Sequence, residues 1–253
     1  MNLRAAALAA LRYLVSLTLF VAVWWAAVRL LRLPPFLLAP PDAVLKTLTH
    51  EWPTYQAAAA ITFGNMAVGA AVGIPLALLV GGVAALSRRL RWVTEPYFGL
   101  FQSFPKEALL PLLVVWLGFG NAPKMVSAGL LAFFPMAVIT LNSLTDTRDD
   151  YLRLMESWKA SRLQVFLHCR APAALPALVA GLKVCLPLAL IGAVLGEFLG
   201  GNGGLGYLIN AAGGAARIDR LFAAVAVLAL GGTLIVGAID AIRLTVLRPF
   251  YQR

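Results

Sequence analysis

Long apolar stretches alternate with short polar ones along this 253-residue chain. About 20 helical residues, rising 1.5 Å each, cross the ~30 Å hydrocarbon core of a bilayer. The pattern therefore predicts an all-α polytopic membrane protein, a single transmembrane domain over residues 1–253 with about six transmembrane helices. The predicted spans are residues 13–32, 57–86, 94–119, 125–144, 173–199 and 221–242. Because Arg29 and Arg32 follow the first stretch in place of a small-residue cleavage site, we favour an uncleaved span over a signal peptide.

One polar, charged segment, residues 145–172, separates the fourth and fifth predicted spans. It cannot lie in lipid, so it must lie in water or against a soluble partner. Its first half predicts a short helix that begins at Asp149 or Asp150, because a carboxylate there accepts from free N–H groups. An apolar stripe at helical spacing follows on that helix. The stripe consists of Tyr151, Leu154, Met155 and Trp158.

The second half of the polar segment predicts another helix. Ser161 and Gln164 fit a capping box, which places the helix start at this point. Phe166 and Leu167 are expected on the buried face of this helix. Pro172 and Pro176 are expected to mark a helix start or a break before the fifth span, since proline lacks the N–H that a helix interior needs.

Small residues recur every four positions in two of the predicted spans, which allows close helix packing in a membrane. The two series are Gly69, Gly73, Ala77 and Gly81, and Gly192, Gly196 and Gly200. A further glycine-rich stretch, residues 200–207, contains a GxGxxG match. No strand precedes the match, so we interpret it as a tight external turn and reject a dinucleotide site.

Composition supports the membrane class. The chain is 61% hydrophobic and 13% charged, whereas a soluble domain is nearer 45–50% apolar and about 25% charged. The net charge of +10 does not indicate nucleic-acid binding, because the basic residues gather at the ends of apolar stretches. The two cysteines, Cys169 and Cys185, make no disulfide framework. The sequence has no HExxH, CxxC or GxSxG motif, so it offers no catalytic set for an enzyme.

The distribution of Lys and Arg predicts the orientation, with both termini and residues 145–172 in the cytoplasm. The predicted inner segments hold Arg4, Arg12, Arg88, Arg89, Arg91, Arg148, Arg153, Lys159, Arg162, Arg170, Arg243, Arg248 and Arg253. The predicted outer segments hold Arg29, Arg32, Lys46, Lys124, Arg217 and Arg220.

Three polar residues near the spans are candidates for the transport pathway. Gln102 and Ser103 interrupt the third span, where they line a pathway or simply lie at the inner interface. Glu197 ends the fifth span. It either faces the pathway or is held by backbone N–H groups of the glycine-rich loop that follows it.

Residues 154–161, Leu-Met-Glu-Ser-Trp-Lys-Ala-Ser, with the Ala171–Pro176 segment after them, resemble the EAA loop of ABC importer permeases. The similarity is greatest to the nitrate/sulfonate/bicarbonate-type, binding-protein-dependent branch. Residues 101–120, FQSFPKEALLPLLVVWLGFG, are similar to the third span of that family. Gly196-Glu197-Phe198 and Gly204-Leu205-Gly206-Tyr207 also match its elements. Lys159 departs from the family, which has Gly there. A left-handed residue other than Gly costs roughly 1 kcal/mol.

The resemblance implies a type I ABC importer (MetI-like) permease fold in the bacterial inner membrane. It implies a homodimer, two cytoplasmic ATPase subunits that bind ATP and Mg²⁺, and a periplasmic or lipid-anchored binding protein. This chain itself would bind no cofactor, metal or nucleic acid. The expected ATPase-coupling residues are Tyr151, Met155, Glu156, Ser157, Trp158, Lys159, Ala160 and Arg162. The implied cargo is a small solute, either a pyrimidine or riboflavin-type vitamin precursor or a nitrate-, sulfonate- or taurine-like anion.

Two other classes of membrane protein stay open at this point. An ion-coupled secondary transporter usually has ionisable residues at mid-span and internal repeats, and this sequence shows almost no mid-span charge and no clear repeat. A non-transport membrane scaffold would not require the apolar stripe of residues 149–161.

Overall fold

The computed structural model describes residues 3–147, 149–200 and 202–246, and every regular element within these ranges is a helix. The elements in chain order are α1 (Leu3–Leu30), α2 (Pro41–His50), α3 (Trp52–Ala85), α4 (Arg88–Ser103), η1 (Lys106–Leu109), α5 (Leu110–Leu117), α6 (Asn121–Thr145), α7 (Asp149–Ser157), α8 (Arg162–Val165), the π-helical turn η2 (Phe166–Arg170), α9 (Ala171–Gly200), α10 (Leu205–Gly214) and α11 (Ile218–Val246). A helix satisfies its own backbone polar groups, which lipid cannot do.

Four helical segments of the described chain are long and apolar enough to cross a membrane. They are Trp52–Ala85, Asn121–Thr145, Leu163–Leu199 and Ile218–Arg243. In place of a straight third span, α4 and the η1–α5 segment form a pair bent by 82°. The bend lies at the predicted interruption. The first helix has a shorter apolar part, Val15–Leu30. The chain is therefore an all-α, multi-pass membrane protein.

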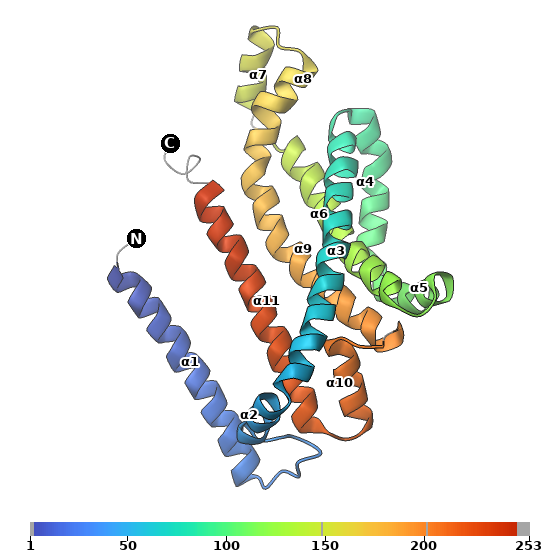
Figure 1. Ribbon diagram of the computed structural model, residues 1–253. Helices are drawn as coiled ribbons and strands as arrows, with labels where there is room; N and C mark the ends of the chain where they lie inside the picture. Colours follow the sequence, from blue (N-terminus) through green and yellow to red (C-terminus); the bar gives the residue numbers. More distant parts are fainter. Residues whose placement is uncertain (1–2, 148, 201, 247–253) are drawn as a thin grey trace.

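The centre of the molecule is a three-helix core of α3, α6 and α9, with α11 and α10 packed beside it (Figure 1). The predicted small-residue series lie in the contacts of this core. A Cβ added at Gly192 would lie 2.6 Å from the Ser127 carbonyl oxygen, and one at Gly196 would lie 2.8 Å from the Cα of Lys124. Real Cβ atoms do not approach that closely, so only glycine permits this spacing of α6 and α9.

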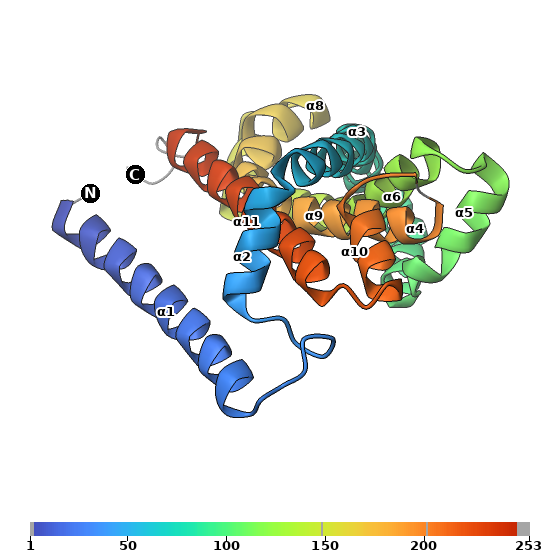
Figure 2. The same ribbon diagram turned by 60° about the horizontal axis from the view of Figure 1, so that its bottom comes forward.

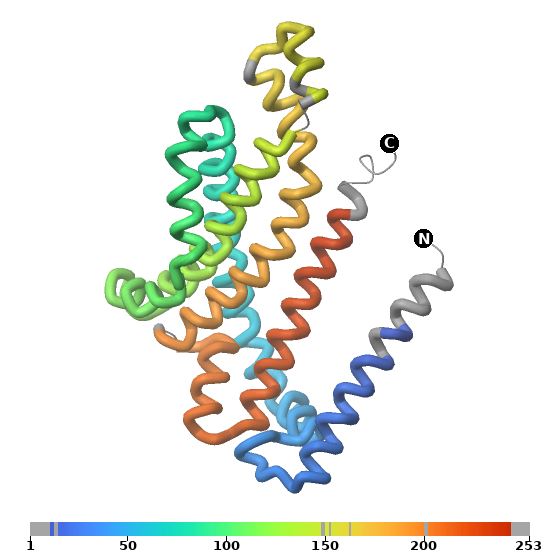
Figure 3. The backbone as a smooth tube through the Cα atoms, turned by 180° about the vertical axis from the view of Figure 1, so that it is seen from behind, coloured from blue at the N-terminus to red at the C-terminus, as the bar shows by residue number. Residues whose placement is uncertain are grey.

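The helix α1 stands away from the bundle along most of its length, as Figure 2 shows from below. Its contact with the rest of the chain is near its C-terminal end, where the rings of Trp24 and Phe222 lie 5.3 Å apart. The N-terminal end of α1 and the C-terminal end of α11 face the same side of the molecule as α7 and α8 (Figure 3). The opposite side carries α2, α10 and the glycine-rich loop.

Two adjacent glycines of α3 give a matched test of this packing. A Cβ at Gly81 would lie 2.8 Å from the Cβ of Thr140 in α6, whereas a Cβ at Gly82 meets nothing within 4 Å. We expect Gly81→Ala to destabilise the folded state by about 1–3 kcal/mol through overpacking. Gly82→Ala should be neutral or stabilising by up to about 1 kcal/mol. Thermal unfolding midpoints of the purified protein in detergent measure the difference. Equal midpoints for the two variants would show that α3 and α6 do not meet at Gly81.

Candidate functional site

The polar segment folds into a helical hairpin, residues 149–165, that projects beyond the ends of the spanning helices (Figures 1 and 3). Its corner is a Schellman motif. The Ala160 N–H donates to the Met155 carbonyl at 3.0 Å, and the Lys159 N–H donates to the Glu156 carbonyl at 2.9 Å. Lys159 occupies the left-handed position of that motif, with φ of 49°. The family's glycine position therefore has the backbone that glycine favours, and Lys159 adopts it at a cost in stability.

The second arm of the hairpin begins with the predicted capping box. The Ser161 N–H donates to Oε1 of Gln164 at 2.7 Å, and the Gln164 N–H donates to Oγ of Ser161 at 3.3 Å. This reciprocal pair satisfies two N–H groups that have no partner within the helix. The corner is therefore fixed on both sides, by the Schellman motif before it and by the capping box after it.

Of the two alternatives predicted at Pro172 and Pro176, a break is wrong, whereas a helix start agrees with α9, which begins at Ala171 directly before Pro172. Helical backbone runs through both prolines, from Leu163 to Leu199. The turn just before Pro172 is the π-helical turn η2, where the Ala171 N–H donates to the Phe166 carbonyl. A wider turn accommodates a proline ring that would otherwise clash with the carbonyl four residues earlier. Leu167, expected on the buried face, is 52% exposed.

Large side chains of the predicted stripe point away from the bundle. Trp158 is 71% exposed and Tyr151 is 54% exposed. Of the other predicted coupling residues, Glu156, Ser157 and Lys159 are exposed, and Met155 and Ala160 are half-buried. The Arg162 side chain lies outside the described residues. A projecting hairpin with exposed aromatic side chains has the composition of a protein-binding surface.

The base of the hairpin contacts the turn between α3 and α4. The Arg170 guanidinium donates to the Ala85 carbonyl at 3.3 Å. A cavity of about 580 Å³ lies beside this contact, between the hairpin and the turn. Arg88 and Arg89 open α4 at the same turn, so basic residues from separate parts of the chain gather at this side.

The pathway candidates Gln102 and Ser103 lie at the bend between α4 and α5, and both are exposed. Phe134 of α6 packs beside this bend. Its ring lies 4.8 Å from the ring of Phe101, and the Lys106 ammonium lies 5.9 Å from its centroid. A cation over an aromatic face is stabilised without a carboxylate partner.

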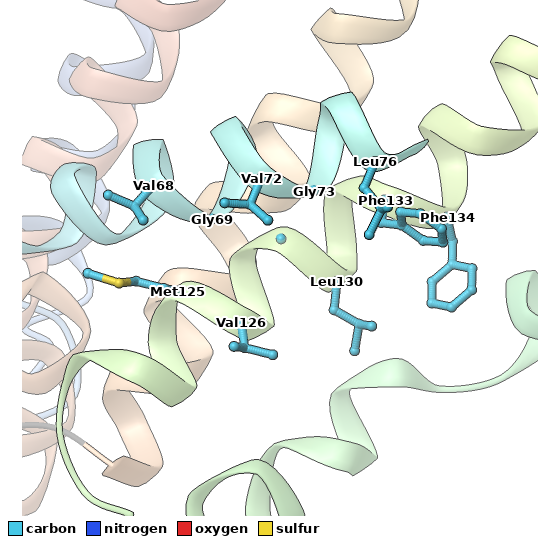
Figure 4. A pocket seen from close by; sticks show the side chains of 11 residues that line it. Val68, Gly69, Val72, Gly73, Leu76, Met125, Val126, Leu130, Phe133 and Phe134 are labelled. Carbon is cyan, nitrogen blue, oxygen red and sulfur yellow. The ribbon is translucent and has the colours of Figure 1, made fainter. Parts of the chain in front are cut away.

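An apolar groove of about 360 Å³ runs between α3 and α6 next to Phe134 (Figure 4). Glycines of both helices form its floor, and the side chains of Val72, Leu130 and Phe133 form its walls. Whether Gln102, Ser103 or this groove meets cargo stays a prediction.

Glu197 is buried, with 1% of its surface exposed. Its Oε2 accepts from the Gly206 N–H at 2.8 Å and from the Thr62 hydroxyl at 2.9 Å. The second of the two alternatives for Glu197, a carboxylate held by the glycine-rich loop, is therefore the arrangement that the structure has. The carboxylate faces protein on α3 and the loop.

Two partners in this region were missed by sequence reasoning. Lys124 was expected in an outer turn, but it lies in the first turns of α6 and is 1% exposed. Its ammonium donates to the Gly203 carbonyl at 3.2 Å. Thr62 is fully buried in α3 and also accepts from the Leu205 N–H at 2.8 Å. In the described part of the chain, no cluster of His, Cys, Asp or Glu could hold a metal ion.

The comparisons with known proteins agree with this architecture. Residues 73–246 match the family described as "Binding-protein-dependent transport system inner membrane component". The chain belongs to this family. It is thus an ABC importer permease subunit, and the prediction made from residues 154–161 is confirmed at the level of the family.

Named relatives of the permease are transport subunits. It is 32% identical to a probable ABC transporter permease protein of Haemophilus influenzae over 219 residues, covering 86% of this chain and 89% of the relative. It is 31% identical to the formylaminopyrimidine transport permease protein ThiX of Halalkalibacterium halodurans, covering 75% and 76%. It is 32% identical to the taurine transport system permease protein TauC of Escherichia coli, covering 85% and 81%.

The fold of the permease is similar to that of a chain in an inward-facing structure of the MetNI methionine ABC transporter. The TM-score is 0.61 at 23% identity, covering 78% of this chain and 94% of that chain. The predicted MetI-like fold is confirmed.

The left-handed conformation of Lys159 yields a test of the hairpin corner. Replacing Lys159 with Gly should stabilise the corner by about 1 kcal/mol, because glycine adopts positive φ without steric cost. Hydrogen exchange of the Ala160 amide should slow by about fivefold. Lys159→Ala, which keeps a Cβ, is the control and should leave the exchange rate unchanged. Faster exchange in the Gly variant would show that the Lys159 side chain itself holds the corner.

Proposed function

We propose that this permease couples a separate cytoplasmic ATPase to solute import through the hairpin of residues 149–165. The observation that carries the proposal is the exposed aromatic pair Tyr151 and Trp158 on a hairpin outside the spans. Exposed apolar side chains on a projecting element fit a complementary groove on another protein. We assign the other predicted coupling residues of the hairpin to the same interface. They are Met155, Glu156, Ser157, Lys159, Ala160 and Arg162.

Membership of the family supports the rest of the proposed assembly. Two copies of the permease form the pathway, and each binds one ATPase subunit, which holds ATP and Mg²⁺. An extracytoplasmic binding protein delivers the cargo. Closure of the ATPase pair moves the hairpin, and the hairpin moves α9 because helical backbone is continuous between them.

The charge distribution supports a cytoplasmic hairpin. Basic residues at the opposite side of the molecule are matched by acidic ones, as in the Arg220–Glu51 pair at 2.6 Å and the Arg217–Asp219 pair at 3.1 Å. On the hairpin side, residues 87–91 and 145–172 together hold eight Lys or Arg and four Asp or Glu. Arg88, Arg89 and Arg153 among them are exposed. An excess of Lys and Arg marks the cytoplasmic side of a bacterial inner-membrane protein.

The cargo we propose is a small polar solute, either a pyrimidine or riboflavin-type vitamin precursor or a nitrate-, sulfonate- or taurine-like anion. Relatives named for formylaminopyrimidine, taurine, riboflavin and nitrate transport support this range. Co-purification of the permease with the products of neighbouring genes, followed by a thermal-shift screen of the binding protein against these compounds, identifies the cargo.

Removal of the Trp158 ring should weaken ATPase binding. A tryptophan at the centre of an interface can contribute about 2 kcal/mol or more to the binding free energy. Trp158→Ala should therefore raise the dissociation constant of the permease–ATPase complex roughly 30-fold. Binding of the purified ATPase to the permease in detergent measures the loss.

The matched control for this experiment is Trp52→Ala. Trp52 is also exposed, at 48%, but it opens α3 at the far side of the molecule. Its substitution should leave ATPase binding unchanged. Wild-type affinity in the Trp158 variant would remove the hairpin from the interface.

A further inference from the structure

Five polar side chains are buried together where α3, α6 and α9 meet the glycine-rich loop. Each is at most 2% exposed, and together they are Thr62, Asn65, Lys124, Ser127 and Glu197. Two of them, Lys124 and Glu197, are ionisable groups near the ends of membrane-spanning helices. Burial of such groups is costly unless hydrogen bonds satisfy them, so their partners indicate what the cluster is for.

Three of those partners are backbone groups within residues 203–206, at the end of the loop and the start of α10. Lys124 of α6 donates to the carbonyl of Gly203, Thr62 of α3 accepts from the N–H of Leu205, and Glu197 of α9 accepts from the N–H of Gly206. We call Thr62, Lys124 and Glu197 the anchor cluster. Three helices therefore hold three residues within the four-residue stretch 203–206, one bond from each helix.

The carboxylate of Glu197 also caps a helix from a distance. α10 begins at Leu205, and its N-cap residue Gly204 offers no side chain to the first N–H groups. Glu197 supplies the missing acceptor, because its Oε2 accepts from the Gly206 N–H in the first turn of α10. Gly204 has φ of 103°, and a Cβ there would collide with the Glu197 carboxylate. The absence of a side chain at Gly204 therefore leaves room for the Glu197 carboxylate.

The anchor cluster is not fully satisfied. The Asn65 amide lies beside Glu197. Among the described residues, neither its Nδ2 nor the carboxylate Oε1 makes a well-formed hydrogen bond. A buried network in which some polar atoms lack a hydrogen bond stabilises the closed arrangement less than a fully hydrogen-bonded network would. Such a network suits an element that must be held and also released.

We propose that the anchor cluster holds the glycine-rich loop and the start of α10 closed against the bundle, and that loop and helix start open together during transport. Opening breaks the bonds to α3, α6 and α9 in one step, so it is all-or-none. The opening of the loop during transport rests on the proposed import function. The closure of the loop by the anchor cluster does not depend on that function.

Closure is tested by the thiol reactivity of Leu205→Cys. Leu205 is fully buried in the closed loop. The variant is made in a Cys169→Ser, Cys185→Ser background and labelled in detergent-permeabilised membranes, so the result depends on neither orientation nor the ATPase. Adding Thr62→Val, which keeps the shape and removes the hydroxyl, should raise the labelling rate at least about tenfold. Glu197→Gln, which replaces the carboxylate with an amide, should also raise the labelling rate at least about tenfold.

Two control substitutions separate loop release from general loosening. Thr140→Val also removes a buried threonine hydroxyl, but among the described residues that hydroxyl bonds only to the Met136 carbonyl of its own helix. Thr62→Ser keeps the hydroxyl of the anchor cluster. Both should label at the parent rate. A parent rate in Thr62→Val, with the protein eluting as a single folded peak, overturns the proposal. If Glu197→Gln does not fold, the Thr62→Val and Thr62→Ser pair alone decides.

The role in transport has a separate measurement. In proteoliposomes without the binding protein, the ATPase subunit should hydrolyse ATP several-fold faster when it is bound to the Thr62→Val permease than to the wild-type permease. The reason is that the loop of the variant opens without the binding protein. Faster labelling with unchanged ATPase activity would overturn this half of the proposal. If no ATPase binds the wild-type permease at all, the import function fails while the labelling result stands.

Discussion

The absence of water from the hydrocarbon core is the constraint on which this structure depends. Every backbone polar group within the core must be satisfied inside the chain, so the described residues fold as helices. A charged side chain within these helices, Lys183 of α9, is paired with Asp240 of α11. Glycine series then let α3, α6 and α9 approach until backbone touches backbone. Two groups of polar residues lie at opposite sides of the molecule, the hairpin at one and the anchor cluster at the other.

A single helical segment links these two sides. Backbone runs without a break from Leu163 in the hairpin to Leu199, two residues past Glu197. At 1.5 Å per residue, its 37 residues span about 55 Å. In the proposed function, a push on the hairpin reaches the anchor cluster through this segment. The π-helical turn η2 lies along this segment, next to the cavity at the base of the hairpin.

Much of this architecture can be predicted from local sequence. Apolar length gives the spanning helices, Ser161 and Gln164 give a capping box, and a glycine position in the family gives the left-handed corner at Lys159. What cannot be predicted depends on distant partners. Nothing near Lys124 in sequence shows that its ammonium meets a carbonyl 79 residues away, or that Thr62 meets Glu197 over 135 residues. Pro172 does not interrupt the helix because the wide turn η2 before it leaves room for the proline ring.

The sidedness of the chain tests this account most directly. Arg153→Cys in the hairpin and Asn202→Cys in the glycine-rich loop are each made without the native cysteines, and both positions are exposed. Intact cells are then treated with a membrane-impermeant thiol reagent. The account predicts labelling at residue 202 and none at residue 153 until the membrane is opened. Labelling of residue 153 from outside would place the hairpin away from any ATPase and contradict the account.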